Sequence, residues 1–106
     1  MIERVYRLGQ LKAGQEKLVE KVVVDKYLNY IHMILPPGQG LPEHNSNANL
    51  YMTVVAGVLT LGLNGEESRN YERGNLVTIP KGIKMNVTNQ NNDVLELIVV
   101  KVPPPE

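Results

Sequence analysis

The chain has 106 residues, of which 42% are hydrophobic, and its 11 basic residues balance 11 acidic ones to a formal net charge of zero. This length predicts one domain over residues 1–106, and the neutral charge argues against nucleic acid or an anionic membrane as a partner, because both bind through a basic face. Cysteine is absent, which excludes disulfides, thiolate metal sites and a cysteine nucleophile. The first residues, MIERVYRLG, lack the apolar core of a signal peptide, so we expect a cytoplasmic protein.

Residues 1–16 are polar, with apolar residues only at scattered positions. Gly9 and Gly14 oppose a long helix there. We therefore expect an N-terminal arm with a short strand near residues 3–8 and a turn near residues 12–15.

From residue 17 onward, short apolar runs alternate with turn residues, which is typical of an all-β sandwich or barrel of nine or ten antiparallel strands. Pro36-Pro37-Gly38 ends one strand, because proline removes a backbone donor. Asn64-Gly65 predicts a tight type I′ hairpin turn, and the proline-rich segment 103–106 forms a tail. The strands are expected at residues 17–25, 27–35, 50–56, 58–63, 66–71, 76–79, 84–89 and 94–102.

Three of these strands, over residues 30–35, 50–56 and 94–100, are apolar on both faces. One face can pack into the barrel, and the other also needs cover, because large apolar patches are uncommon on monomers. We expect a homodimer packed sheet against sheet. The alternative is that the chain's own N-terminal strands cover the outer face.

The spacing of glycine, proline and asparagine resembles the second motif of the cupin family, G-x5-P-x-G-x2-H-x3-N. Gly74, Pro80, Gly82 and Asn89 occupy its scaffold positions, while Met85 replaces its histidine. The resemblance covers roughly residues 17–102 and implies a jelly-roll β-barrel.

The first cupin motif, G-x5-H-x-H-x3–4-E-x6-G, matches at His44 and Gly57, but Ser46 replaces its second histidine and Leu50 its glutamate. In the family, three histidines and a glutamate hold a divalent metal inside the barrel. One imidazole does not make such a site, since leucine cannot ligate and methionine suits only soft ions. We therefore expect no metal or other cofactor, and the alternative is an unusual site that adds His32 or Glu43 to His44.

The resemblance implies that several side chains point into the barrel. His44 is the candidate polar anchor, although it could equally bond to a loop backbone. Asn45, Asn47 and Asn49 could contact a ligand at the barrel mouth, although ordinary turn chemistry explains them too. The expected ligand-binding residues of the interior are His44, Ser46, Leu50, Met52 and Met85.

These features predict non-enzymatic binding of a small, partly apolar molecule, with no catalytic residue assigned. A metal-dependent cupin enzyme of the dioxygenase or isomerase type, built around His44, is the first alternative. A structural or interaction subunit whose barrel is filled by Leu50, Met52 and Met85 is the second.

Overall fold

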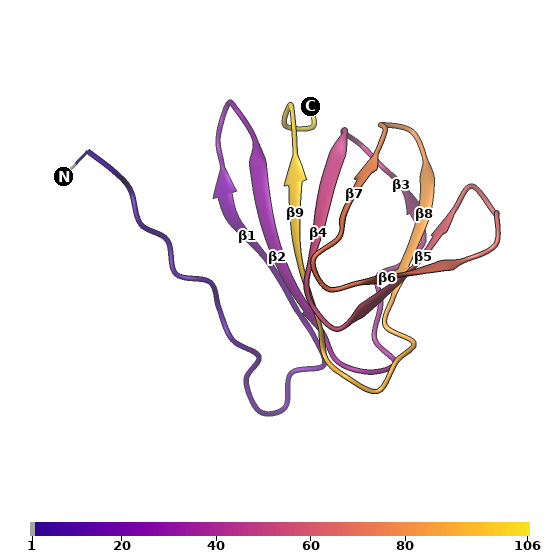
Figure 1. The fold of residues 1–106 in the computed structure, drawn as a ribbon. Helices are drawn as coiled ribbons and strands as arrows, with labels where there is room; N and C mark the ends of the chain where they lie inside the picture. The colour runs from indigo at the N-terminus through magenta and orange to yellow at the C-terminus, as the bar shows by residue number, and fades with distance from the viewer. Residues whose placement is uncertain (1) are drawn as a thin grey trace.

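The computed structural model describes residues 2–106, which form nine strands in two antiparallel sheets (Figure 1). A five-stranded sheet has the order β1-β2-β9-β4-β7, and it faces a four-stranded sheet of order β3-β8-β5-β6. Within residues 2–106, no helix is long and apolar enough to cross a membrane. The strands are β1 (Leu18–Val24), β2 (Asn29–Leu35), β3 (His44–Asn45), β4 (Leu50–Ala56), β5 (Val58–Leu63), β6 (Arg69–Glu72), β7 (Leu76–Ile79), β8 (Lys84–Thr88) and β9 (Leu95–Lys101).

The core lies between the two sheets and follows from the two-residue alternation of the strands. In β9, Leu95, Leu97 and Val99 point inward and are buried, whereas the residues between them point outward. Strands β2 and β4 pair with β9 on either side, so their inward and outward residues match those of β9. The prediction of an all-β fold is confirmed.

Asn89 ties the two sheets together at one end of the barrel. Its side chain is buried and donates to the carbonyl oxygens of Leu35 and Asp93, each at 2.8 Å, while its Oδ1 accepts from the amide of Asn91 at 3.0 Å. A buried amide must satisfy its polar atoms, and this one does so by joining the end of β2 to the loop between β8 and β9.

Two local expectations differ from the structure. The strand expected near residues 3–8 is wrong, because this part of the chain makes no ladder with any described strand. The turn near residues 12–15 is confirmed by a backbone bond from Gln15 to Lys12. Asn64 and Gly65 both have positive φ, as the predicted turn requires, but β6 begins only at Arg69 instead of residue 66.

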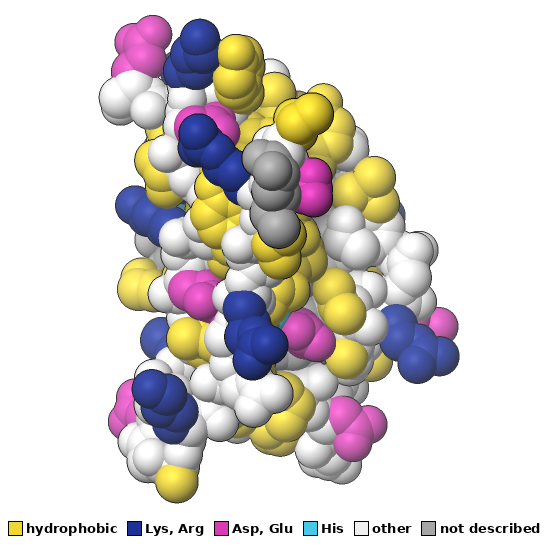
Figure 2. Space-filling model, turned by 90° about the vertical axis from the view of Figure 1, so that its left-hand side faces the viewer, with side chains coloured by type: hydrophobic (Ala, Val, Ile, Leu, Met, Phe, Trp, Pro, Cys, Tyr) yellow, Lys and Arg dark blue, Asp and Glu magenta, His cyan; other side chains and the backbone are white. Residues whose placement is uncertain are grey.

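Residues 2–17 form an extended arm beside β1 and β2, on the side away from the core (Figure 1). Tyr6 and Leu8 of this arm border a shallow hollow with Val22, Val23 and Tyr30. Figure 2 shows this side of the molecule, where hydrophobic side chains gather between scattered acidic and basic ones. The arm covers only part of the sheet's outer face, since Tyr51 and Val55 on β4 remain exposed.

Gly57, between β4 and β5, provides a test of how tightly this scaffold is packed. Its φ is +78°, and a Cβ at this position would collide with the carbonyl oxygen of Val94. Gly74 has a similar φ of +92° but open space around it, so it serves as the matched control. We expect Gly74→Ala to lower the free energy of unfolding by about 1 to 2 kcal/mol through backbone strain, and Gly57→Ala to lower it by about 2 kcal/mol more.

Urea denaturation measures both variants. Equal losses at the two glycines would show that the backbone around Val94 yields to the added methyl group.

Candidate functional site

A cavity of about 180 Å³ lies inside the barrel between the two sheets. Its wall is mainly apolar, and the exposed residues Lys21, His44 and Asn47 border its mouth. The cavity is lined by Val19, Lys21, Ile31, Met33, Leu41, His44, Ser46, Asn47, Leu50, Met52, Met85, Val87, Val99 and Lys101.

The five interior residues singled out from the sequence all border this cavity, in three different roles. Leu50, Met52 and Met85 are buried and form part of its apolar wall. Ser46 is also buried, and its hydroxyl donates to the Pro80 carbonyl at 2.7 Å and accepts from the Ile83 amide at 3.0 Å. Ser46 therefore holds the turn between β7 and β8.

His44 lies on β3 at the cavity mouth, where its Nδ1 is 2.8 Å from the carbonyl oxygen of Pro42. A carbonyl oxygen only accepts, so Nδ1 carries the hydrogen of this bond. In the neutral ring Nε2 is then an acceptor. Two alternatives for His44 followed from the sequence: a bond to the loop backbone and a place beside the pocket. Both occur together.

The three asparagines near the mouth have separate surroundings. Asn47 lines the cavity and accepts a hydrogen bond at 2.9 Å from Nζ of Lys101. Asn49 accepts from the backbone amide of Lys81, which is a turn-stabilising role. Asn45 is exposed on β3, outside the residues that line the cavity.

Two lysines that the sequence reasoning missed, Lys21 and Lys101, also line the cavity. Lys101 continues the inward series of β9 two residues beyond Val99, so strict alternation along that strand could have found it. Lys21 gives no such signal, because β1 carries a bulge between residues 21 and 23. Burial lowers the pKa of Lys101, and the nearby charge of Lys21 lowers it further.

The residues at the cupin ligand positions do not fit a divalent metal. Leu50 and Met85 offer no hard ligand, and the hydroxyl of Ser46 is already used by the backbone. Glu43 pairs at the surface with Lys84 at 3.2 Å. Over residues 2–106, no three His, Cys, Asp or Glu side chains are grouped so that they could hold a metal.

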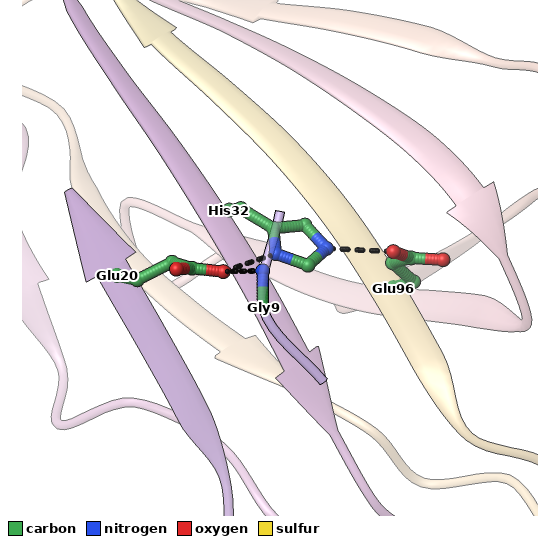
Figure 3. A network of polar contacts seen from close by, with 4 residues as sticks. All are labelled: Gly9, Glu20, His32 and Glu96. Atoms are coloured by element: carbon green, nitrogen blue, oxygen red, sulfur yellow. Dashed lines mark hydrogen bonds and ion pairs between the residues drawn. The ribbon is translucent and has the colours of Figure 1, made fainter. Parts of the chain in front are cut away.

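His32 lies on the outer face of the five-stranded sheet, so it does not join His44 inside the barrel. Its Nδ1 is 2.8 Å from Oε2 of Glu20 on β1, and its Nε2 is 2.6 Å from Oε2 of Glu96 on β9 (Figure 3). The amide of Gly9 in the arm also donates to Oε2 of Glu20, at 2.6 Å. Since both ring nitrogens are occupied, His32 has no free lone pair for a metal or for proton abstraction.

The charges of this network favour an imidazolium between two carboxylates. Burial of the His32 ring opposes its charged form, but the hydrogen bonds and charges of Glu20 and Glu96 outweigh burial and raise the pKa of His32 above 6.5. The hydrogen bond from His32, followed by that from Gly9, lowers the pKa of Glu20 below 4.5. The network therefore joins β1, β2 and β9 to the arm.

Comparison with known proteins gives a consistent result for the fold. The model of a family described as "Cupin domain" matches residues 31–101. An uncharacterized protein of Methanocaldococcus jannaschii is 39% identical over 106 residues, which span all of this chain and 90% of that protein.

The solved structures agree with these matches. The crystal structure of the same M. jannaschii protein, described as an RmlC-like cupin family protein with a double-stranded β-helix fold, has a TM-score of 0.86 at 39% identity and covers 97% of this chain and 93% of that one. A conserved protein of unknown function from Streptococcus pyogenes has a TM-score of 0.77 at 20% identity, covering 99% and 93% of the two chains. At that identity the likeness concerns the fold alone.

The His32 network predicts a pH-dependent contribution to stability. A raised folded-state pKa means that His32 stabilises fully below pH 6.5 and loses this effect as the pH rises through its folded pKa. A lowered folded-state pKa means that Glu20 stabilises fully above pH 4.5 and loses this effect as the pH falls through its folded pKa. The contribution is therefore greatest between pH 4.5 and 6.5.

We expect His32→Gln to lower the free energy of unfolding by about 2 kcal/mol near pH 5.5, and by clearly less near pH 9. His44→Gln, at the exposed histidine, is the control and should change it by less than about 0.5 kcal/mol. Chemical denaturation across this pH range makes the measurement. A loss for His32→Gln that is equal at both pH values would contradict an imidazolium at this position.

Proposed function

Since this chain belongs to the cupin family, we propose that it uses its barrel to bind a small, partly apolar molecule, with His44 as a polar anchor and without a metal. The observation that carries this proposal is the cavity of about 180 Å³ among Leu50, Met52 and Met85. A barrel filled by its own side chains, as a purely structural subunit would have, leaves no such space.

The size and lining of the cavity support an organic ligand of about six non-hydrogen atoms. An engineered apolar cavity of about 150 Å³ in another protein stays dry and binds benzene. Here the apolar wall would enclose an apolar group about the size of benzene. Nε2 of His44 at the mouth can accept one hydrogen bond. A molecule with a small apolar body and one polar end satisfies both parts of the site.

Benzene and phenol are suitable probes because they differ only in a hydroxyl group. We expect both to bind in the barrel, and we expect Val99→Phe to abolish binding of both by filling the cavity. Val24→Phe, at an exposed valine of β1 that does not line the cavity, is the control and should leave binding intact. His44→Ala should weaken phenol by about fivefold, the effect of one modest hydrogen bond, and leave benzene unchanged.

Nuclear magnetic resonance titrations measure all four proteins, and thermal unfolding checks that each variant folds. If neither probe shifts the signals of cavity residues, or if Val99→Phe binds them normally, the proposal is wrong.

We also propose a homodimer formed through the outer face of the five-stranded sheet. Tyr51 and Val55 on β4 are 44% and 40% exposed although they lie on a sheet face. Ile34, Ile98 and Val100 continue the apolar surface on β2 and β9, half-buried. The arm covers the β1 side of this face, so the β4 side is the part that would pack against the second copy.

A charge placed in this surface tests the dimer. We expect Val55→Arg to produce a monomer, because an unpaired charge in an apolar interface costs several kcal/mol. Tyr27→Arg is the control, since Tyr27 is exposed in the turn between β1 and β2 and away from the sheet face. Sedimentation velocity at micromolar concentration distinguishes the two states, and a monomeric unmodified protein would contradict the proposal.

A further inference from the structure

We infer that the cavity selects a small monocarboxylate, with the anion between Lys21 and Lys101 at the mouth and its apolar body against Leu50, Met52 and Met85. This inference rests on the proposed binding in the barrel and adds the chemical class of the ligand. Its anchor is the pair of lysines instead of His44, because a carboxylate only accepts hydrogen bonds and Nε2 of neutral His44 has none to donate.

The distribution of charge around the cavity favours an anionic ligand. The chain as a whole is neutral, with 11 basic and 11 acidic residues. The residues that line the cavity nevertheless include two lysines and a histidine, and none of them is acidic. Among the described residues, neither Lys21 nor Lys101 takes part in an ion pair, so the mouth holds two positive charges without a counter-charge.

The pairing of the strands places both lysines on the inner face of the sheet. Lys21 on β1 is opposite Ile31 of β2, and Lys101 on β9 is opposite Leu50 of β4, so both lysines lie on the inner face. These side chains therefore extend along the same cavity wall from two strands separated only by β2.

Lys101 keeps hydrogen-bond donors available for a ligand. Its ammonium donates to Oδ1 of Asn47, which is neutral, at 2.9 Å. An ammonium has three donors, so two remain for a ligand at the mouth. The pKa of Lys101 is lowered by burial and by the charge of Lys21, and a bound anion would relieve the second of these effects.

The form of the site favours a carboxylate over a phosphate. Phosphate sites commonly surround the anion with backbone N–H groups at a helix terminus or a glycine-rich loop. Within residues 2–106, no helix supplies such a terminus, and Gly40 and Gly57, the closely packed loop glycines, do not line the cavity. A planar carboxylate on a body of about six atoms fits the small apolar space and leaves its charged end at the mouth.

Benzoate and benzamide test this inference, because they share a shape and differ in charge. Isothermal titration of the full chain at fixed ionic strength should show benzoate binding about tenfold more tightly than benzamide, which corresponds to about 1.4 kcal/mol. Lys101→Met keeps the apolar stem and should bring this ratio close to one. Lys26→Met, at a lysine above the exposed ring of Tyr27, is the matched control and should keep the tenfold ratio.

Lys21→Met provides a second variant should Lys101→Met fail to fold, and it should lower the ratio in the same direction. Raising the salt concentration should weaken benzoate and leave benzamide unchanged.

The outcomes separate this inference from the proposal on which it rests. Equal binding of benzoate and benzamide, lost in Val99→Phe, would overturn the carboxylate inference and keep the proposed function. Inorganic phosphate that binds more tightly than benzoate would overturn the choice of carboxylate. Binding of neither aromatic probe would overturn both proposals.

Discussion

Strand β9 lies between β2 and β4, and its antiparallel register with both decides which side chains face the cavity. Because neighbouring residues in a strand point to opposite faces, a slip of one residue would exchange the two faces completely. In the observed register, Val99 and Lys101 face inward, while Glu96 faces outward beside His32. The cavity and the His32 network are therefore two consequences of the same pairing.

Several residues at the positions that resemble the cupin motifs bond or pack within the protein itself. Asn89 joins β2 to the β8–β9 loop, and Ser46 holds the β7–β8 turn through two backbone bonds. Leu50 and Met85 form part of the cavity wall. Side-chain amides, hydroxyls and glycines at positive φ hold the turns of the barrel.

The sequence was sufficient for most strands, because apolar runs from residue 17 onward are separated by proline, glycine and asparagine. It failed in the arm, where a polar segment without a partner strand resembles a short strand by composition alone. Alternation along β9 could have placed Lys101 in the cavity. The network of Glu20, His32 and Glu96 had no sequence signal, since its members lie on three strands, and His32 is 64 residues from Glu96 along the chain.

The part of the five-stranded sheet formed by β1, β2 and β9 carries different charges on its two faces. Its outer face holds two carboxylates around one imidazole, and its inner face holds Lys21 and Lys101. Because these groups largely cancel in the total, a formal net charge of zero hides them. Net charge is a sound guide to partners such as nucleic acids, which contact a wide surface. For a ligand of a few atoms, the charges that border the cavity decide the preference, and here those charges are positive.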